Sequence, residues 1–136
     1  MSEFPVRAVA WVESTLDDRA AAPKQGDEGA PDCWVRFAPG LEPALDGLAP
    51  GAEVLLLTWL DRADRAVLAV HPRGDTSRPR TGVFATRSPD RPNPIGLHRV
   101  TILSLDGLAM RVRNLEALDG TPVLDVKPLL GDPGDR

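Results

Sequence analysis

Turn signals divide this chain into short segments, and no segment shows the period of a long amphipathic helix. Asp106-Gly107 and Asp119-Gly120 are typical of tight turns between antiparallel strands. The run 53–60, EVLLLTWL, is too short for a convincing helix and predicts a buried central strand. Short strands at hairpin spacing predict an all-β fold with little helix, a small barrel or sandwich forming one domain, 1–136. Further strands are expected at 6–13, 33–37, 66–71, 81–85, 99–105, 109–114 and 122–126.

Two segments are expected to lie outside these strands. Residues 14–32 are polar and rich in Ala, Gly and Asp, which predicts a long loop of the functional or disordered kind. Residues 41–48 predict one or two helical turns that end before Pro50-Gly51.

Length and cysteine content limit the possible classes of protein. A chain of 136 residues can form one domain that buries roughly two thirds of its unfolded surface without disulfides or metals. Cys33 is the only cysteine, so an internal disulfide and a cysteine-based zinc site are both excluded. This usage favours a reducing cytoplasm, with Cys33 as a buried thiol. The first residues resemble neither a signal peptide nor a membrane span, so we expect neither secretion nor membrane insertion.

The segment 81–99, TGVFATRSPDRPNPIGLHR, joins an apolar run to a proline-rich loop. Residues 82–85 predict a short buried strand. Three X-Pro steps then follow within seven residues, and each fixes the φ of its proline and favours extended backbone before it. Arg87, Arg91 and Asn93 would therefore project from a stiff scaffold and lose little entropy on binding a ligand.

The net charge of −4 is unevenly distributed along the chain. Residues 71–99 hold six arginines and two aspartates, a net charge of +4, which leaves −8 for the remainder. A basic patch on an acidic body can attract an anion to one face while the rest of the surface repels it. Arginine, used here in place of lysine throughout, suits contacts with phosphates and base edges, although an ordinary solvated surface is the alternative interpretation.

Two blocks, at 82–96 and at 119–128 (DGTPVLDVKP), closely resemble the TsaA-like family of tRNA methyltransferases of the TrmO type. The resemblance is close in these blocks, looser before Glu53, and in register over most of the chain. It implies an enzyme that uses S-adenosylmethionine (SAM) to methylate N6 of threonylcarbamoyladenosine, the modified base 3′ of the tRNA anticodon. It also implies a cytoplasmic homodimer built on a β-barrel. Because the chain has no GxGxxG motif between a strand and a helix, loops between strands would have to bind SAM.

The resemblance assigns SAM contacts to residues of both blocks. Arg87 can pair with the SAM carboxylate, and Leu97 can cover the adenine face. The turn DGTP can read ribose or adenine edges through its amides and side-chain oxygens, although the same residues also suit a plain hairpin turn. The residues implied in these blocks are Arg87, Leu97, Asp119, Gly120, Thr121 and Pro122.

Two further SAM contacts fall where this sequence departs from the family pattern. Pro23, Lys24 and Gln25 stand where the family has Pro-Arg-Gln, and Glu53 and Val54 stand where it often has His-Leu. Lysine keeps the charge of arginine but loses its bidentate fork. Glutamate in place of histidine would add a negative charge near the sulfonium or else point away from it. Either change could alter the choice of substrate.

The RNA side is expected to involve arginines and one amide. Arg73 and Arg78 would contact phosphates from the loop that precedes the first block. Single-stranded loops are also held by base stacking, but the three tryptophans lie in expected strands, where core packing is favoured. Stacking on arginine planes is the expected substitute. The residues expected to bind the substrate are Arg80, Arg91, Asn93 and Arg99.

No single catalytic base stands out from the sequence. Asp90, Asp119 and Asp125 are candidates by position, and Asp125 also suits an ion pair with a nearby lysine. His71 and His98 are each expected to be surface or satisfied histidines, with nothing to bring them together as a catalytic pair. Because a carbamoyl group acidifies N6, the reaction could proceed without a dedicated base.

Two other functions remain open at this stage. A SAM-binding barrel could act on a small metabolite or serve as a non-catalytic sensor, given the departures at Lys24 and Glu53. A plain oligonucleotide-binding barrel would need more aromatic side chains on its strand faces than this chain has.

Overall fold

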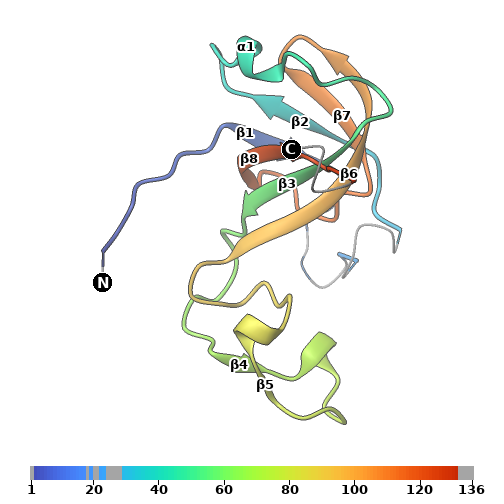
Figure 1. Ribbon diagram of the computed structural model, residues 1–136. Coiled ribbons are helices and arrows are strands. Elements are labelled where there is room, and N and C mark those ends of the chain that lie inside the picture. The colour runs from blue at the N-terminus through green and yellow to red at the C-terminus, as the bar shows by residue number, and fades with distance from the viewer. Residues whose placement is uncertain (1, 18, 20–21, 24–28, 132–136) are drawn as a thin grey trace.

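The computed structural model describes residues 2–17, 19, 22–23 and 29–131, and its main body is a closed β-barrel (Figure 1). Six strands follow one another around the barrel in the order β1-β2-β7-β6-β3-β8, and every neighbouring pair is antiparallel. The prediction of an all-β fold with little helix is confirmed. The strands are β1 (Ala10–Glu13), β2 (Cys33–Phe37), β3 (Glu53–Trp59), β6 (Ile95–Asp106), β7 (Ala109–Arg113) and β8 (Pro122–Pro128).

Alternation of buried and more exposed side chains shows how these segments form a barrel with one interior face. Along β3, Val54, Leu56 and Thr58 are buried while the residues between them are more exposed, as the two-residue period of a strand requires. The same alternation on the other strands supplies the rest of the interior. The core consists of Ala10, Val12, Cys33, Val35, Val54, Leu56, Val100, Ile102, Met110, Val112, Leu115, Ala117 and Val123.

The pairing of β3 with β6 determines which residues meet at each end of the barrel. The register runs from Glu53 opposite Thr101 to Trp59 opposite Ile95. Thr58 lies opposite Gly96, and His98 is the next residue of β6 whose side chain points inward. Polar side chains therefore line the interior where β6 begins. Glu53 lies at the opposite end of β3.

A small lobe extends from the barrel end where β3 finishes and β6 begins (Figure 1). It contains the two-stranded sheet of β4 (Ala69–Val70) and β5 (Thr81–Gly82) and the 3₁₀ turns η1 (Pro72–Gly74) and η2 (Val83–Ala85). The single α-helix in the described residues, α1 (Glu42–Leu45), lies at the other end of the barrel and within the predicted range 41–48. None of the helices in these ranges is long and apolar enough to cross a membrane.

Several strand predictions were wrong at their boundaries. The strand expected at 81–85 ends at Gly82, and the residues after it form η2, in which Phe84 is 85% exposed. The strand expected from residue 99 begins at Ile95, and the strand expected at 66–71 shrinks to β4. The N-terminal strand starts at Ala10. Val9 still hydrogen-bonds to the barrel, and residues 2–7 extend away from it (Figure 1).

Candidate functional site

A cavity of about 430 Å³ opens at the lobe end of the barrel, a size within the range of small-molecule sites. The start of β6, the loop that follows β3, the proline-rich loop before β6 and the loop before β8 all contribute to its walls. Its lining is partly apolar, with Leu97 and Leu118, and partly charged. The charged side chains that face it are Arg19, Asp61, Arg62, Arg87, Arg91 and Glu116.

A buried chain of three side chains forms the floor of this cavity. The His98 ring lies 2.5 Å from Glu116, between Nδ1 and Oε1, and 2.6 Å from Thr58, between Nε2 and Oγ1. Thr58 is completely buried, and the side chains of His98 and Glu116 are 4% and 19% exposed. Of the three, His98 and Glu116 reach the cavity wall. The imidazole is therefore held at both of its nitrogens.

Gly96 makes room for this arrangement. A Cβ atom at position 96 would lie 2.6 Å from His98 Nε2 and would also overlap Thr58 Oγ1. No real Cβ atom approaches its neighbours so closely, so the glycine is required by the close approach of the histidine ring and not by a turn.

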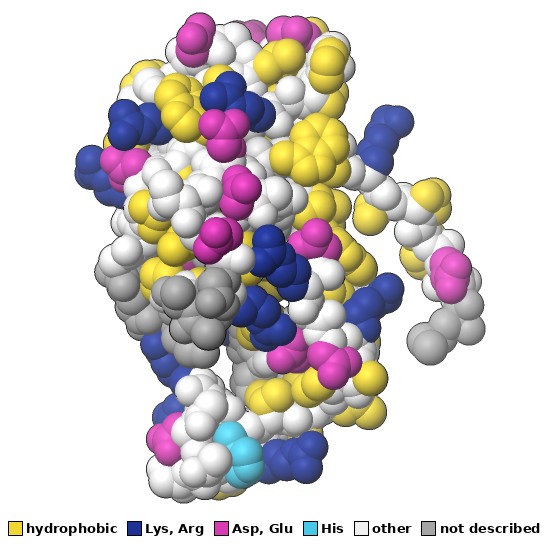
Figure 2. Space-filling view, turned by 180° about the vertical axis from the view of Figure 1, so that it is seen from behind, with side chains coloured by type: hydrophobic (Ala, Val, Ile, Leu, Met, Phe, Trp, Pro, Cys, Tyr) yellow, Lys and Arg dark blue, Asp and Glu magenta, His cyan; other side chains and the backbone are white. Residues whose placement is uncertain are grey.

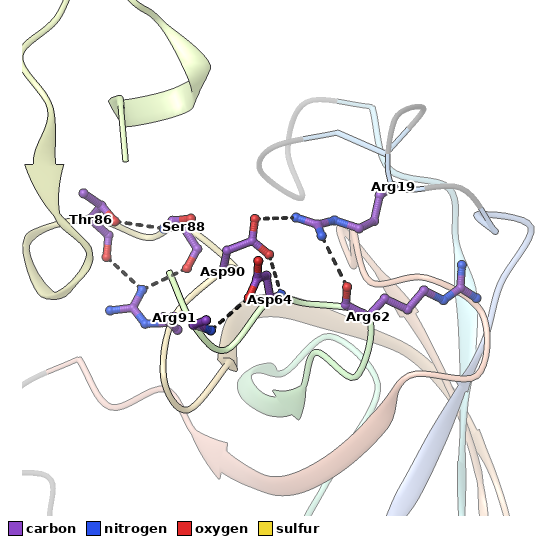
Figure 3. Close-up of polar contacts among 8 residues, drawn as sticks. Arg19, Arg62, Asp64, Thr86, Ser88, Asp90 and Arg91 are labelled. Carbon is purple, nitrogen blue, oxygen red and sulfur yellow. Dashed lines mark hydrogen bonds and ion pairs between the residues drawn. The ribbon is translucent and has the colours of Figure 1, made fainter. Parts of the chain in front are cut away.

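Arg91 organises the proline-rich wall (Figure 3). Its Nη1 donates to the carbonyls of Thr86 and Ser88, both at 3.0 Å, and its Nη2 donates to the carbonyl of Val83 at 2.9 Å. These bonds gather three backbone carbonyls of the loop around one guanidinium, and the bond to Val83 holds the start of η2. In this chain Arg91 serves the shape of the loop.

Arg65 supports the same wall from the side. Its guanidinium lies 5.1 Å from the centre of the Trp59 ring, in a cation–π contact, and donates to the Pro92 carbonyl at 2.7 Å and to Asn93 Oδ1 at 3.0 Å. Asn93 is thereby oriented at the cavity edge with its amide N–H groups still able to donate.

An ion pair between Arg19 and Asp90 crosses the cavity rim (Figure 3). The two charges are 3.1 Å apart, and Asp90 also accepts the backbone N–H of Asp64 at 2.9 Å. Partial burial raises the pKa of Asp90, but the Asp64 hydrogen bond and Arg19 outweigh this effect, so the net pKa lies below its usual value. Asp90 is thus kept ionised and occupied, which makes it a poor proton acceptor.

A second cavity, of about 720 Å³, lies between the lobe and the loop 85–90 and shares part of its wall with the first. Arg19, Arg73, Arg80 and Arg87 line it, and its carboxylate, Asp90, is already paired. The face in Figure 2 shows Lys and Arg side chains interspersed with Asp and Glu, without a separate basic area. Three of the six arginines of 71–99, Arg73, Arg80 and Arg87, thus line this cavity.

The turn before β8 lies against β1. Thr121 N–H donates to the Leu118 carbonyl, and Gly120 has a φ of +81°, which suits glycine at the third position of a turn. Asp119 Oδ1 accepts the N–H of Ser14 at 3.0 Å, so its carboxylate is used in the turn. Of the four residues of this turn predicted to bind SAM, Thr121 is the one that reaches the first cavity.

The structure brings together only part of the predicted site. Pro23, Arg87, Leu97 and Thr121 line the first cavity, together with Arg91 and Asn93 from the predicted substrate set. Arg80 and Arg87 line the second cavity. Asp119, Gly120 and Pro122 line neither, and Lys24 and Gln25 lie outside the described residues.

Glu53, Val54 and Arg99 lie away from both cavities. Glu53 and Arg99 form an exposed ion pair at 2.6 Å on the outer wall. The hydrogen bond from Arg99, and then its positive charge, lower the pKa of Glu53. Val54 is buried in the core. Within one chain, the replacement of the His-Leu pair by Glu53 and Val54 therefore changes nothing in the walls of either cavity.

Comparison with known proteins identifies the family. A sequence model of the tRNA-methyltransferase O N-terminal domain matches residues 11–132. The chain belongs to the TrmO family. The resemblance noted in the two sequence blocks is confirmed.

Relatives within the TrmO family carry names that refer to SAM. A protein of Methanothermobacter thermautotrophicus, named as a probable S-adenosyl-L-methionine-binding protein, is 43% identical over 130 residues, which is 96% of this chain and 93% of that protein. An S-adenosyl-L-methionine-binding protein of Archaeoglobus fulgidus is 37% identical over 122 residues, covering 90% of this chain and 86% of that protein. The predicted cofactor is the ligand for which these relatives are named.

Crystal structures of TrmO have the same fold. The TrmO of Pseudomonas aeruginosa superposes with a TM-score of 0.76 at 27% identity, covering 100% of this chain and 60% of that one. A second TrmO structure gives a TM-score of 0.77 at 29% identity, covering 98% of this chain and 59% of the other. The chain thus spans about 60% of the length of these solved proteins.

Sequence reasoning missed the floor of the cavity. His98 was expected to be a surface or a satisfied histidine, and the structure shows the second of these, but its partners Thr58 and Glu116 were not singled out. The available signals were the inward position of Thr58 in an apolar strand and the acidic residue just before DGTP. Asp125, a candidate base, instead pairs with Lys127 at 3.1 Å on exposed β8, as the ion-pair alternative predicted.

Proposed function

We propose that this chain is a SAM-dependent methyltransferase that transfers a methyl group to N6 of threonylcarbamoyladenosine beside the tRNA anticodon. Membership of the TrmO family supports the reaction class. The observation that carries the proposal is the pair of adjoining cavities, one lined by family-motif residues and the other by arginines, with Arg87 in the shared wall. Such a pair could hold a nucleoside cofactor beside a phosphate-bearing substrate.

The first cavity has the chemical character that SAM requires. Leu97 and Leu118 offer apolar cover for the adenine, and Arg87 has no hydrogen bond or ion pair to a described residue, so its guanidinium is available to the SAM carboxylate. When bound, SAM would supply an electrophilic methyl group. The chain's contribution is to hold the acceptor nitrogen in line with it, which can supply about 7 to 11 kcal/mol of the barrier.

Cofactor binding can be measured directly by calorimetry with SAM. A charge-assisted hydrogen bond is worth about 1.5 to 3 kcal/mol, so Arg87→Ala should weaken SAM binding roughly ten- to a hundredfold. Arg78→Ala, which removes an arginine outside both cavities, is the matched control. Unchanged affinity in Arg87→Ala would remove Arg87 from the SAM site.

The substrate is tested by methyl transfer from labelled SAM to two tRNA samples. One carries the threonylcarbamoyl group and the other is an unmodified transcript of the same sequence. Incorporation into the modified tRNA alone supports the proposal, whereas equal incorporation into both would contradict the proposed substrate.

A second candidate is a SAM-binding barrel that acts on a small metabolite or as a sensor. The names of the archaeal relatives support this second candidate, because they mention SAM binding and no reaction. Intact SAM binding with no transfer to either tRNA would support this candidate.

Dimerisation is part of the proposal. Glu53 stands where the family has a SAM-contacting residue, yet it lies at the opposite end of β3 from the cavity. A symmetric partner could bring its Glu53 to the cavity of this chain. Sedimentation at micromolar concentration tests this, and a monomer that binds SAM with full affinity would contradict a shared site.

A further inference from the structure

Among the carboxylates considered for proton transfer, Asp90, Asp119 and Asp125 are all occupied elsewhere. Asp90 is paired with Arg19, Asp119 accepts a backbone N–H in its turn, and Asp125 pairs with a lysine on the outer wall. Glu116 differs from them. Its Oε1 is engaged by His98, and its Oε2 has no partner in the described part of the chain, although the side chain lines the first cavity.

We propose that Glu116 is the proton acceptor for methyl transfer in this cavity, and that His98 and Thr58 position its carboxylate. The inference rests on the proposed function, because it assigns a residue to that reaction. It concerns the cavity floor, to which neither sequence block assigned a role.

The hydrogen-bond directions along the floor follow from donor chemistry. An ionised Glu116 can only accept, so His98 Nδ1 carries the proton between them. A neutral imidazole then has Nε2 as an acceptor, and the hydroxyl of Thr58 donates to it. Thr58 is completely buried, so it forms the inner end of this series of hydrogen bonds, and Glu116 forms the end that faces the cavity. The histidine is thus locked in one tautomer and the carboxylate in one orientation.

The surroundings favour a carboxylate that receives a proton over one that merely pairs with a cation of the protein. The other charged groups facing the cavity are Arg19, Asp61, Arg62, Arg87 and Arg91, and none forms an ion pair with Glu116. Ala117 and Leu118 beside it are buried and apolar. A fixed carboxylate with one unused oxygen in a partly apolar cavity is suited to act as a general base.

The proposed step balances as follows. The electron pair of the acceptor nitrogen forms the new N–CH₃ bond, and the S–CH₃ bond breaks with its electrons remaining on sulfur, so the sulfonium becomes a neutral thioether. The proton lost from nitrogen goes to Glu116 Oε2, and it passes to water when the products leave.

The test compares Glu116→Gln with wild type in single-turnover methyl transfer to the modified tRNA. The amide keeps the size of the side chain and can still accept from His98, but it cannot take up a proton. We expect the rate at saturating substrates to fall about 10²- to 10⁴-fold while KM for tRNA and affinity for SAM change by less than about twofold. Glu13→Gln removes an exposed carboxylate that pairs with Arg36 outside the cavity, and it is the matched control.

The positioning role of His98 has its own readout. His98→Asn places an amide N–H near the position of Nδ1 and should restore much of the rate that His98→Ala loses. Equal rates in these two variants, with folding confirmed by circular dichroism, would overturn the positioning role, because a purely structural effect does not depend on that donor.

Four outcomes overturn the inference. Wild-type turnover in Glu116→Gln would exclude Glu116 as the acceptor, and loss of turnover in Asp61→Asn alone would transfer the role to Asp61. A loss of affinity for SAM without a matching loss for its demethylated product, whose sulfur carries no charge, would show that Glu116 pairs with the sulfonium charge instead. If the wild-type protein methylates neither tRNA, the proposed function and this assignment are both overturned. This outcome differs from the others because it is seen in the wild type and not only in a variant.

Discussion

Gly96 shows how a single missing side chain can decide the geometry of a site. It lies on β6 directly opposite Thr58, and the His98 ring occupies the space above it. The floor of the first cavity therefore depends on the absence of a methyl group at this position.

Gly96→Ala should destabilise the fold by about 1 to 3 kcal/mol, because the new Cβ forces His98 or Thr58 out of place. Urea unfolding gives the difference in free energy. Gly82→Ala is the matched control, since its Cβ would meet no atom closer than 4.0 Å. Equal stability of the two variants would show that the ring can move aside at no cost.

Cys33 should be chemically inert in the folded protein. Burial, with smaller effects from Asp32 and Glu116, raises the pKa of its thiol to about 12. Because the folded pKa exceeds that of an exposed thiol, the group stays protonated near pH 8, where the unfolded chain begins to form thiolate. Alkylation by iodoacetamide at pH 8 should be slow without denaturant and fast in urea, and rapid labelling of the folded protein would contradict this burial.

At the scale of elements, the proline-rich loop is held by Arg91. Removing this side chain leaves three loop carbonyls without their charged donor. The loop carries Arg87, and the position of Arg87 depends on η2 before it and on the X-Pro steps after it. Loss of the Arg91 side chain should therefore alter the proposed SAM site through the loop as well as at the cavity wall that Arg91 itself lines.

Arg91→Ala should lower stability by about 1.5 to 3 kcal/mol, the worth of hydrogen bonds to a charged group, and should weaken SAM binding as well. Arg91→Lys should restore little, because an ammonium cannot span the three carbonyls as a planar fork does. Thermal melting and calorimetry measure the two effects. If Arg91→Ala kept full stability and lost only RNA binding, the contact predicted from sequence would be the better interpretation.

The same elements show what the sequence could and could not predict. The short apolar run EVLLLTWL was enough to place β3, and the Asp-Gly turns were enough to predict hairpins around a barrel. Residues 83–85 are apolar and suit a strand, but they form η2, and the carbonyl of Val83 at its start accepts a hydrogen bond from Arg91. The floor of the cavity was harder to predict, since Thr58, His98 and Glu116 are far apart in the sequence. The register of β3 with β6 brings Thr58 close to His98, and the loop before β8 brings Glu116 to the same ring.

At the scale of the whole molecule, the arginines of 71–99 differ in the contacts that they make. Arg91 is committed to its loop and Arg99 to Glu53, whereas Arg80 lines the second cavity with no hydrogen bond or ion pair to a described residue. Counting arginines along the chain therefore overstates the number that can meet phosphates.

Arg80→Ala should flatten the dependence of log K for tRNA on log salt by about 0.7, the share of one neutralised phosphate in a single strand. Arg99→Ala should leave the slope nearly unchanged, because that side chain is already paired on the outer wall. Filter binding at several salt concentrations measures both slopes. A larger change in Arg99→Ala than in Arg80→Ala would place the RNA on the barrel wall instead of in the second cavity.

The contact between Arg65 and Trp59 has an optical consequence. The same guanidinium that covers the indole also holds the Pro92 carbonyl and Asn93 at the cavity edge. Any ligand that draws Asn93 toward itself alters the charge above the ring, and with it the fluorescence of Trp59. With Trp11 and Trp34 replaced by phenylalanine, the unlabelled protein would report by its own emission whether the cavity is filled.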